Sequence, residues 1–135
     1  MKTLDMQFIR YLNLFEKITR VSTKNCFSYN NIIIFGVPPA FISRAIGEGG
    51  RNIKKMSEIL GRKIKVIPFP CRNIYEFICK IIEPLRFKSL EMTEKEVIIN
   101  AGRQSKAALI GRNKQRLEEL NDIVKEYYNK EVRII

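Results

Sequence analysis

Two short stretches of the sequence place glycines beside basic side chains, a combination suited to contacting phosphate. Residues 47–50, the first loop, read Gly-Glu-Gly-Gly, and a helix is expected to begin directly after them. Glycine lets the chain turn sharply and lets another backbone approach closely, and the free N–H groups at a helix N-terminus attract an anion. The candidate contact residues here are Arg44, Ile46, Gly47, Glu48, Gly49, Gly50, Arg51 and Lys54.

Residues 111–114, the second loop, read Gly-Arg-Asn-Lys and follow an isoleucine as the first loop does, at an offset of 64 (110 − 46). The segment from Arg103 to Arg116 holds five basic residues and no acid. Neither stretch has the Gly-Lys-Ser/Thr sequence of a P-loop, which excludes that kind of nucleotide site. The candidate contact residues here are Lys106, Ile110, Gly111, Arg112, Asn113 and Lys114.

A purely structural interpretation of both loops stays open beside the functional one. Gly47, Gly49 and Gly50 can serve simply as a helix C-cap and a turn. Ile46 and Ile110 are core residues in the first place, and they bear on function only if an apolar groove runs beside each loop. One such loop is a weak signal, whereas two at corresponding places of a repeated unit are a stronger one.

The elements that must position these loops also repeat. At the same offset Ile33–Phe35 falls on Val97–Ile99, and each copy predicts a helix, two strands, two helices and a strand. In the first copy we expect these elements at residues 5–18, 22–29, 32–37, 41–46, 51–60 and 63–66. In the second copy we expect them at residues 74–82, 87–92, 96–100, 104–110, 117–127 and 131–134.

Pro68 and Pro70 mark the boundary between the copies, because proline is expected to end the preceding strand. The sequence therefore predicts an α+β protein with two small domains in tandem, residues 1–70 and 71–135.

The charge balance favours a polyanionic partner. The 135 residues carry 25 Lys and Arg against 14 Asp and Glu, a net charge of +11, and nucleic acid is the commonest partner of such a surface. A generally lysine-rich proteome would give the same balance. No apolar run approaches the roughly 20 residues of a spanning helix, and the start has no signal-peptide pattern. We therefore expect a cytoplasmic protein with no membrane contact.

The reactive side chains argue against catalysis. The chain has no histidine, and its three cysteines, Cys26, Cys71 and Cys79, lack metal-site spacing. A Ser-His or Cys-His nucleophile is impossible without histidine. We expect no enzyme, no catalytic residue, no metal, no cofactor and no small-molecule substrate.

The repeated unit resembles a known family of RNA-binding domains. A glycine loop between two helices resembles the KH domain, and a leading helix and hairpin followed by helix, helix and strand resembles its type II form. Two such units in one short chain, opened by residues 8–16, resemble the archaeal NusA-like transcription factors. The most similar stretch is residues 45–54 together with residues 59–66.

This resemblance implies two tandem type II KH domains, each a three-stranded sheet covered by helices on one face. It implies single-stranded RNA as the partner, about four nucleotides per module, in transcription elongation or termination. An RNA polymerase elongation complex is a further candidate partner. Glu48 and Lys114 depart from the family pattern, because the first places an acid in the loop and the second replaces a glycine.

Two other functions remain as alternatives. A KH-type ribosomal or ribosome-assembly protein would use the same modules for docking on RNA. A helix-turn-helix DNA binder shares the pair of helices joined by a glycine-containing turn, but the strands before and after each pair argue against it.

Overall fold

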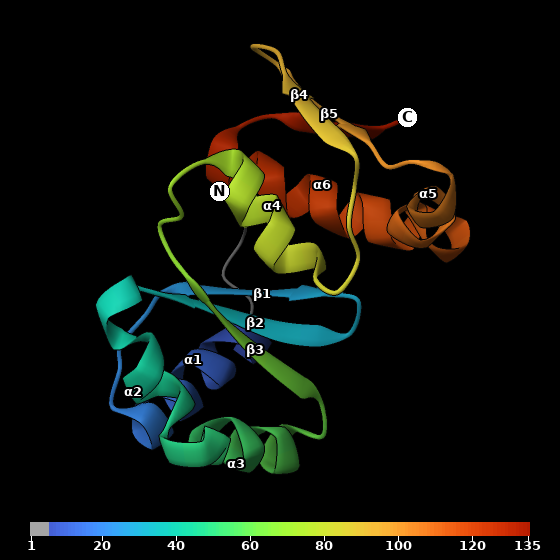
Figure 1. The fold of residues 1–135 in the computed structure, drawn as a ribbon. Helices are drawn as coiled ribbons and strands as arrows, with labels where there is room; N and C mark the ends of the chain where they lie inside the picture. The colour runs from blue at the N-terminus through green and yellow to red at the C-terminus, as the bar shows by residue number, and fades with distance from the viewer. Residues whose placement is uncertain (1–5) are drawn as a thin grey trace. The chain divides into compact units, whose positions relative to one another are not determined.

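The computed structural model describes residues 6–135, which contain six α-helices and two three-stranded sheets. The chain divides into two compact units, and the boundary along the sequence lies between Cys71 and Arg72 (Figure 1). No helix within these residues is both long enough and apolar enough to cross a bilayer.

The first unit contains three strands in the order β1-β2-β3. β1 pairs with β2 in antiparallel fashion, and β3 returns parallel to β2 on its other side. Its elements are α1 (Met6–Thr19), β1 (Asn25–Tyr29), β2 (Ile32–Val37), α2 (Ile42–Ile46), α3 (Arg51–Leu60) and β3 (Lys63–Pro68).

The second unit repeats this element order and sheet topology. β4 is antiparallel to β5, and β6 is parallel to β5. Its elements are α4 (Ile74–Ile82), β4 (Ser89–Met92), β5 (Glu96–Asn100), α5 (Arg103–Ile110), α6 (Gln115–Tyr128) and β6 (Glu131–Ile134).

In each unit the helices lie on one face of the sheet (Figure 1). The first core forms where α1 meets the central strand, and the rings of Phe15 and Phe35 stack with centroids 4.3 Å apart. In the second unit Phe77 of α4 contacts Tyr127 and Tyr128 of α6, at centroid distances of 5.7 Å and 5.3 Å. Burying such aromatic surface is a major source of stability.

The structure confirms the predicted α+β class and the repeated element order, and it corrects several boundaries. β1 begins at Asn25 instead of residue 22, because the Thr23 hydroxyl accepts from the Asn25 N–H (3.1 Å) and donates to the Gly36 carbonyl (2.6 Å). A side chain bound to nearby backbone in this way forms a turn that competes with strand pairing. β4 begins at Ser89 instead of residue 87.

One further boundary differs in the first unit. β3 ends at Pro68, two residues later than expected (68 − 66), because β3 is an edge strand, where proline is tolerated. In α3, Met56 is fully buried, whereas Ile59 is 55% exposed.

Candidate nucleic-acid interface

The first loop is a tight turn between α2 and α3. Gly47 ends α2, and its N–H donates to the Ser43 carbonyl at 3.0 Å. Glu48–Gly50 then form a single 3-10 turn, and α3 begins directly after it. Gly47, Gly49 and Gly50 have φ of 81°, 63° and 76°, a region that ordinary side chains avoid. The backbone path therefore explains why these three positions are glycine.

The second loop follows the same path with different residues. Gly111 ends α5, and Arg112–Lys114 form the matching 3-10 turn before α6. Asn113 and Lys114 have φ of 55° and 61°, where the first loop has glycines. Among the three pairs of positions with positive φ, the largest difference is 15°, from 76° at Gly50 to 61° at Lys114. Asparagine tolerates this region, but Lys114 keeps the turn at a cost in strain.

The two sides of the first loop differ in accessibility. A Cβ built on Gly49 or Gly50 would meet no atom within 4 Å, so this side is open to an approaching polymer backbone. A Cβ on Gly47 would instead lie 2.9 Å from the Asn52 amide nitrogen, and one on Gly111 would lie 3.0 Å from Arg116 Cγ. The first glycine of each loop is thus required for packing, and the later positions face outward.

The residues that crowd these first glycines also join the two helices. Asn52 Nδ2 donates to the Arg44 carbonyl at 3.2 Å. Arg116 Nη1 donates to the Ala108 carbonyl at 2.8 Å. Asn52 and Arg116 are related by the repeat offset (116 − 52 = 64), as are their acceptors. We call this pair of hydrogen bonds the helix brace. The helix brace was not predicted, although the repeat offset aligns two side chains that can both donate.

Both loops lead into helices whose first turn has no side-chain cap. Gly50 precedes α3 and Lys114 precedes α6, and neither provides a side-chain hydrogen bond to the helix. In α4, by contrast, the Asn73 side chain accepts from the Glu76 N–H at 2.9 Å. The first N–H of each helix, on Arg51 and Gln115, instead donates to the preceding 3-10 turn, at the Glu48 and Arg112 carbonyls. The positive dipole ends of α3 and α6 favour an anion at these loops.

The cations around the loops are exposed and unpaired. Within residues 6–135, none of these candidate cations forms an ion pair: Arg44, Arg51, Lys54, Lys106, Arg112 and Lys114. Other basic residues do form ion pairs, such as Lys125, whose Nζ lies 2.6 Å from Glu131 Oε1. Unpaired positive charge next to the positive end of a helix dipole suits a phosphate ligand.

The structure places the remaining predicted site residues as follows. Ile46 and Ile110 are half-buried at the C-terminal ends of α2 and α5, beside the loops. Lys106 lies one turn before Ile110 on the same face of α5. Glu48 is exposed within the first loop. Each unit thus gathers its own candidate residues around its own loop.

The chain matches no protein-family model. It is 27% identical over 124 residues, 89% of its length and 71% of the relative's, to the "Probable transcription termination protein NusA" of Methanococcus vannielii. The protein of the same name from Methanocaldococcus jannaschii is 27% identical over 128 residues, 92% of this chain and 69% of that protein. The crystal structure of APE1850 aligns with 98% of this chain and 100% of its own, at 27% identity and a TM-score of 0.70. Over nearly all of its length, then, the chain is similar to archaeal proteins named for NusA.

Proposed function

We propose that each unit is a type II KH module and that the chain binds single-stranded RNA through its two loops, without catalytic activity. We further propose that it acts on RNA in transcription elongation or termination, with the RNA polymerase elongation complex as its setting. The names of the two archaeal relatives support the link to transcription.

The observation that carries the RNA-binding proposal is the recurrence of one loop geometry. Both loops present outward-facing residues in the left-handed region, directly before an uncapped helix and among unpaired cations. The sequences differ at three of four positions, yet the backbone is the same. A simple turn would not need exposed cations around it in both copies. A ligand with regularly spaced phosphates accounts for the recurrence.

The topology supports the assignment to the KH class. Each unit runs helix, strand, strand, helix, loop, helix, strand, and its final strand lies parallel to the central one. In KH domains the glycine loop holds the RNA backbone. The half-buried Ile46 and Ile110 would then lie where the bases rest on an apolar groove.

The decisive test changes charge in the first loop while leaving its fold intact. The double variant Glu48→Asp, Gly49→Asp adds a carboxylate on the open side of the turn, where aspartate tolerates a positive φ. The matched control Glu48→Asp, Gly49→Asn has nearly the same shape without the added charge. We expect the acidic variant to lose most of its affinity for single-stranded RNA, and the control to retain it, with similar melting temperatures.

Three results would count against the proposal. Equal affinity in the acidic variant and the control would remove the phosphate contact from the first loop. A matching loss of stability in both variants would favour a purely structural turn. Tighter binding of duplex DNA than of single-stranded RNA would favour the helix-turn-helix alternative.

A further inference from the structure

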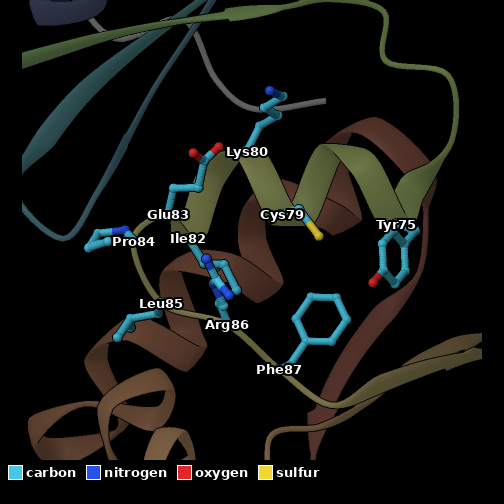
Figure 2. Close-up of a pocket in the computed structure, with 9 residues that line it drawn as sticks. All are labelled: Tyr75, Cys79, Lys80, Ile82, Glu83, Pro84, Leu85, Arg86 and Phe87. Atoms are coloured by element: carbon cyan, nitrogen blue, oxygen red, sulfur yellow. The ribbon is translucent and has the colours of Figure 1, made fainter.

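A second basic surface of the unit 72–135 lies at the opposite end of α5 from the second loop. A pocket of about 400 Å³, the basic pocket, is lined by residues 86–88 and 101–105. A neighbouring pocket of about 510 Å³, the aromatic pocket, is lined by α4 and the segment that follows it (Figure 2). Arg86 and Phe87 line both pockets, so the two share a wall, and we call them together the joined pockets.

The basic pocket has the chemistry of an anion site. Arg86, Lys88 and Arg103 contribute three exposed cations, and no acid lines the pocket. None of the three forms an ion pair in the described part of the chain. A Cβ on Gly102 would lie 3.1 Å from Lys88 Cε, so the lysine stem packs over Gly102, where α5 starts without a side-chain cap.

The aromatic pocket offers a different surface. Tyr75, 49% exposed, and Phe87 meet edge to face with ring centroids 5.2 Å apart. Figure 2 shows the Cys79 sulfur pointing into the space between the two rings. Burial raises the pKa of the Cys79 thiol and the Glu83 carboxylate adds to this, while a hydrogen bond with Tyr75 opposes it. The thiol therefore stays protonated and gives the aromatic pocket an uncharged lining at this point.

The two pockets separate phosphate from base. Glu83 lines the aromatic pocket together with Lys80 and Arg86, whereas the basic pocket is lined by three cations and no acid. Aromatic rings next to cations are the combination that binds single-stranded nucleic acid, because bases stack on rings while cations hold the backbone. A duplex would keep its bases paired and out of reach of Tyr75.

We infer that these joined pockets bind one nucleotide of single-stranded RNA, with its base against Tyr75 and Phe87 and its phosphate among Arg86, Lys88 and Arg103. This inference rests on the proposed binding of single-stranded RNA, but not on either loop. The eight residues of α5 separate the nucleotide from the second loop by about 12 Å along the helix. The contact therefore lengthens the RNA path on this unit beyond its loop.

The experiment measures binding of a labelled mixed-sequence single-stranded RNA to the full chain and its variants. Tyr75→Leu should lower affinity about fivefold or more, and Tyr75→Phe should bind like the unmodified chain. The triple variant Arg86→Gln, Lys88→Gln, Arg103→Gln should lower affinity and reduce the slope of log affinity against log salt by about 0.7, one phosphate. A control with the same loss of charge on exposed residues of the other unit is Arg10→Gln, Lys17→Gln, Lys24→Gln.

The outcomes separate this site from the loops. If the pocket variants bind like the charge-matched control while the acidic first-loop variant weakens, the inference is overturned and the proposed function stands. If the pocket variants weaken while the acidic loop variant binds normally, the inference stands and the first-loop contact fails. Ultraviolet crosslinking should add RNA to the peptides carrying Tyr75 or Phe87. Crosslinks confined to the loop peptides would overturn the inference.

Discussion

Glu48 is the only acidic side chain in either loop, and it is exposed where a phosphate is proposed to lie. Reversing its charge should therefore strengthen binding instead of weakening it. We expect Glu48→Lys to tighten single-stranded RNA binding by about 1 kcal/mol, roughly fivefold, the scale of one exposed charge contact.

The matched control for this substitution is Glu58→Lys, an equal charge reversal at an exposed position farther along α3. A titration at one salt concentration compares the two variants. Equal tightening in both would mean that net charge, and not the loop position, sets the affinity. No change in Glu48→Lys alongside loss of binding in Arg112→Ala and Lys114→Ala would assign RNA binding to the second loop alone.

Lys114 shows the opposite departure, because a long side chain occupies a left-handed position (φ 61°). Such a conformation costs about 1–2 kcal/mol for a residue with a Cβ. Glycine would relieve this strain but would add freedom to the unfolded chain, an opposing effect of about 0.4–1 kcal/mol. We expect Lys114→Gly to raise thermal stability by up to about 1 kcal/mol, and Lys114→Val to lower it, because a β-branched residue fits this region worst.

Thermal denaturation of the two Lys114 variants measures this directly. A lower melting temperature in Lys114→Gly would show that the lysine side chain stabilises the folded loop by more than its strain. RNA affinity is a separate readout, because glycine permits closer backbone approach and also removes a cation.

At the scale of elements, the helix brace links the two helices that flank each loop. Asn52→Ala and Arg116→Met each remove one hydrogen bond to a main-chain carbonyl. We expect each to lower the free energy of unfolding by about 1 kcal/mol. We also expect faster amide hydrogen exchange at Gly50 or Lys114, whose N–H groups donate across the turn to Gly47 and Gly111.

Arg112→Met is the control for Arg116→Met, because it removes the same charge from an exposed residue that forms no ion pair among residues 6–135. It should weaken RNA binding with little change in stability. If both methionine variants destabilise the fold equally, the Arg116 hydrogen bond does not hold the helices together.

The order of elements was predictable because each one carries a local signal. Asn30-Asn31 between two apolar strands predicts the hairpin turn, and both residues do adopt positive φ. Gly61 predicts the end of α3, and its N–H closes the helix onto the Ser57 carbonyl at 2.8 Å. The hairpin turn and the helix end depend on residues adjacent in the chain, so they can be predicted from the sequence alone.

What escaped prediction depends on contacts between distant residues. The start of β1 is set by the Thr23 hydroxyl and the Gly36 carbonyl, thirteen residues apart. The helix brace joins residues eight apart across a turn, and the sequence does not reveal the geometry of that turn. The joined pockets of the second unit bring Tyr75, Phe87 and Arg103 together from three separate segments. No periodicity or local motif in the sequence indicates these contacts.

At the scale of the whole molecule, the charge is unevenly divided. Residues 1–70 carry 12 basic and 4 acidic residues, a net +8 (12 − 4), and residues 71–135 carry 13 and 10, a net +3 (13 − 10). If backbone phosphates dominate binding, log affinity for single-stranded RNA should fall linearly with log salt, by about 0.7 per neutralised phosphate. Titrations at several salt concentrations measure the slope.

The same salt titration, applied to variants, identifies the cations that contact RNA phosphates. Arg112→Gln together with Lys114→Gln should reduce the slope by about 1.4 if each cation neutralises one phosphate. An affinity that does not change with salt would place the RNA on another surface. An unchanged slope in the double variant would exclude the second loop from the phosphate path.

The shared backbone of the two loops is reached at different thermodynamic cost. Three glycines hold the turn in the first loop without strain, but they lose much conformational entropy when they are ordered. Asn113 and Lys114 restrict the second loop before any ligand arrives, at the cost of strain in the folded state. Binding at the first loop should thus carry the larger entropic penalty, and binding at the second should benefit from preorganisation. Warming should consequently weaken RNA binding at the first loop more than at the second, so the two proposed contacts should differ in their temperature dependence.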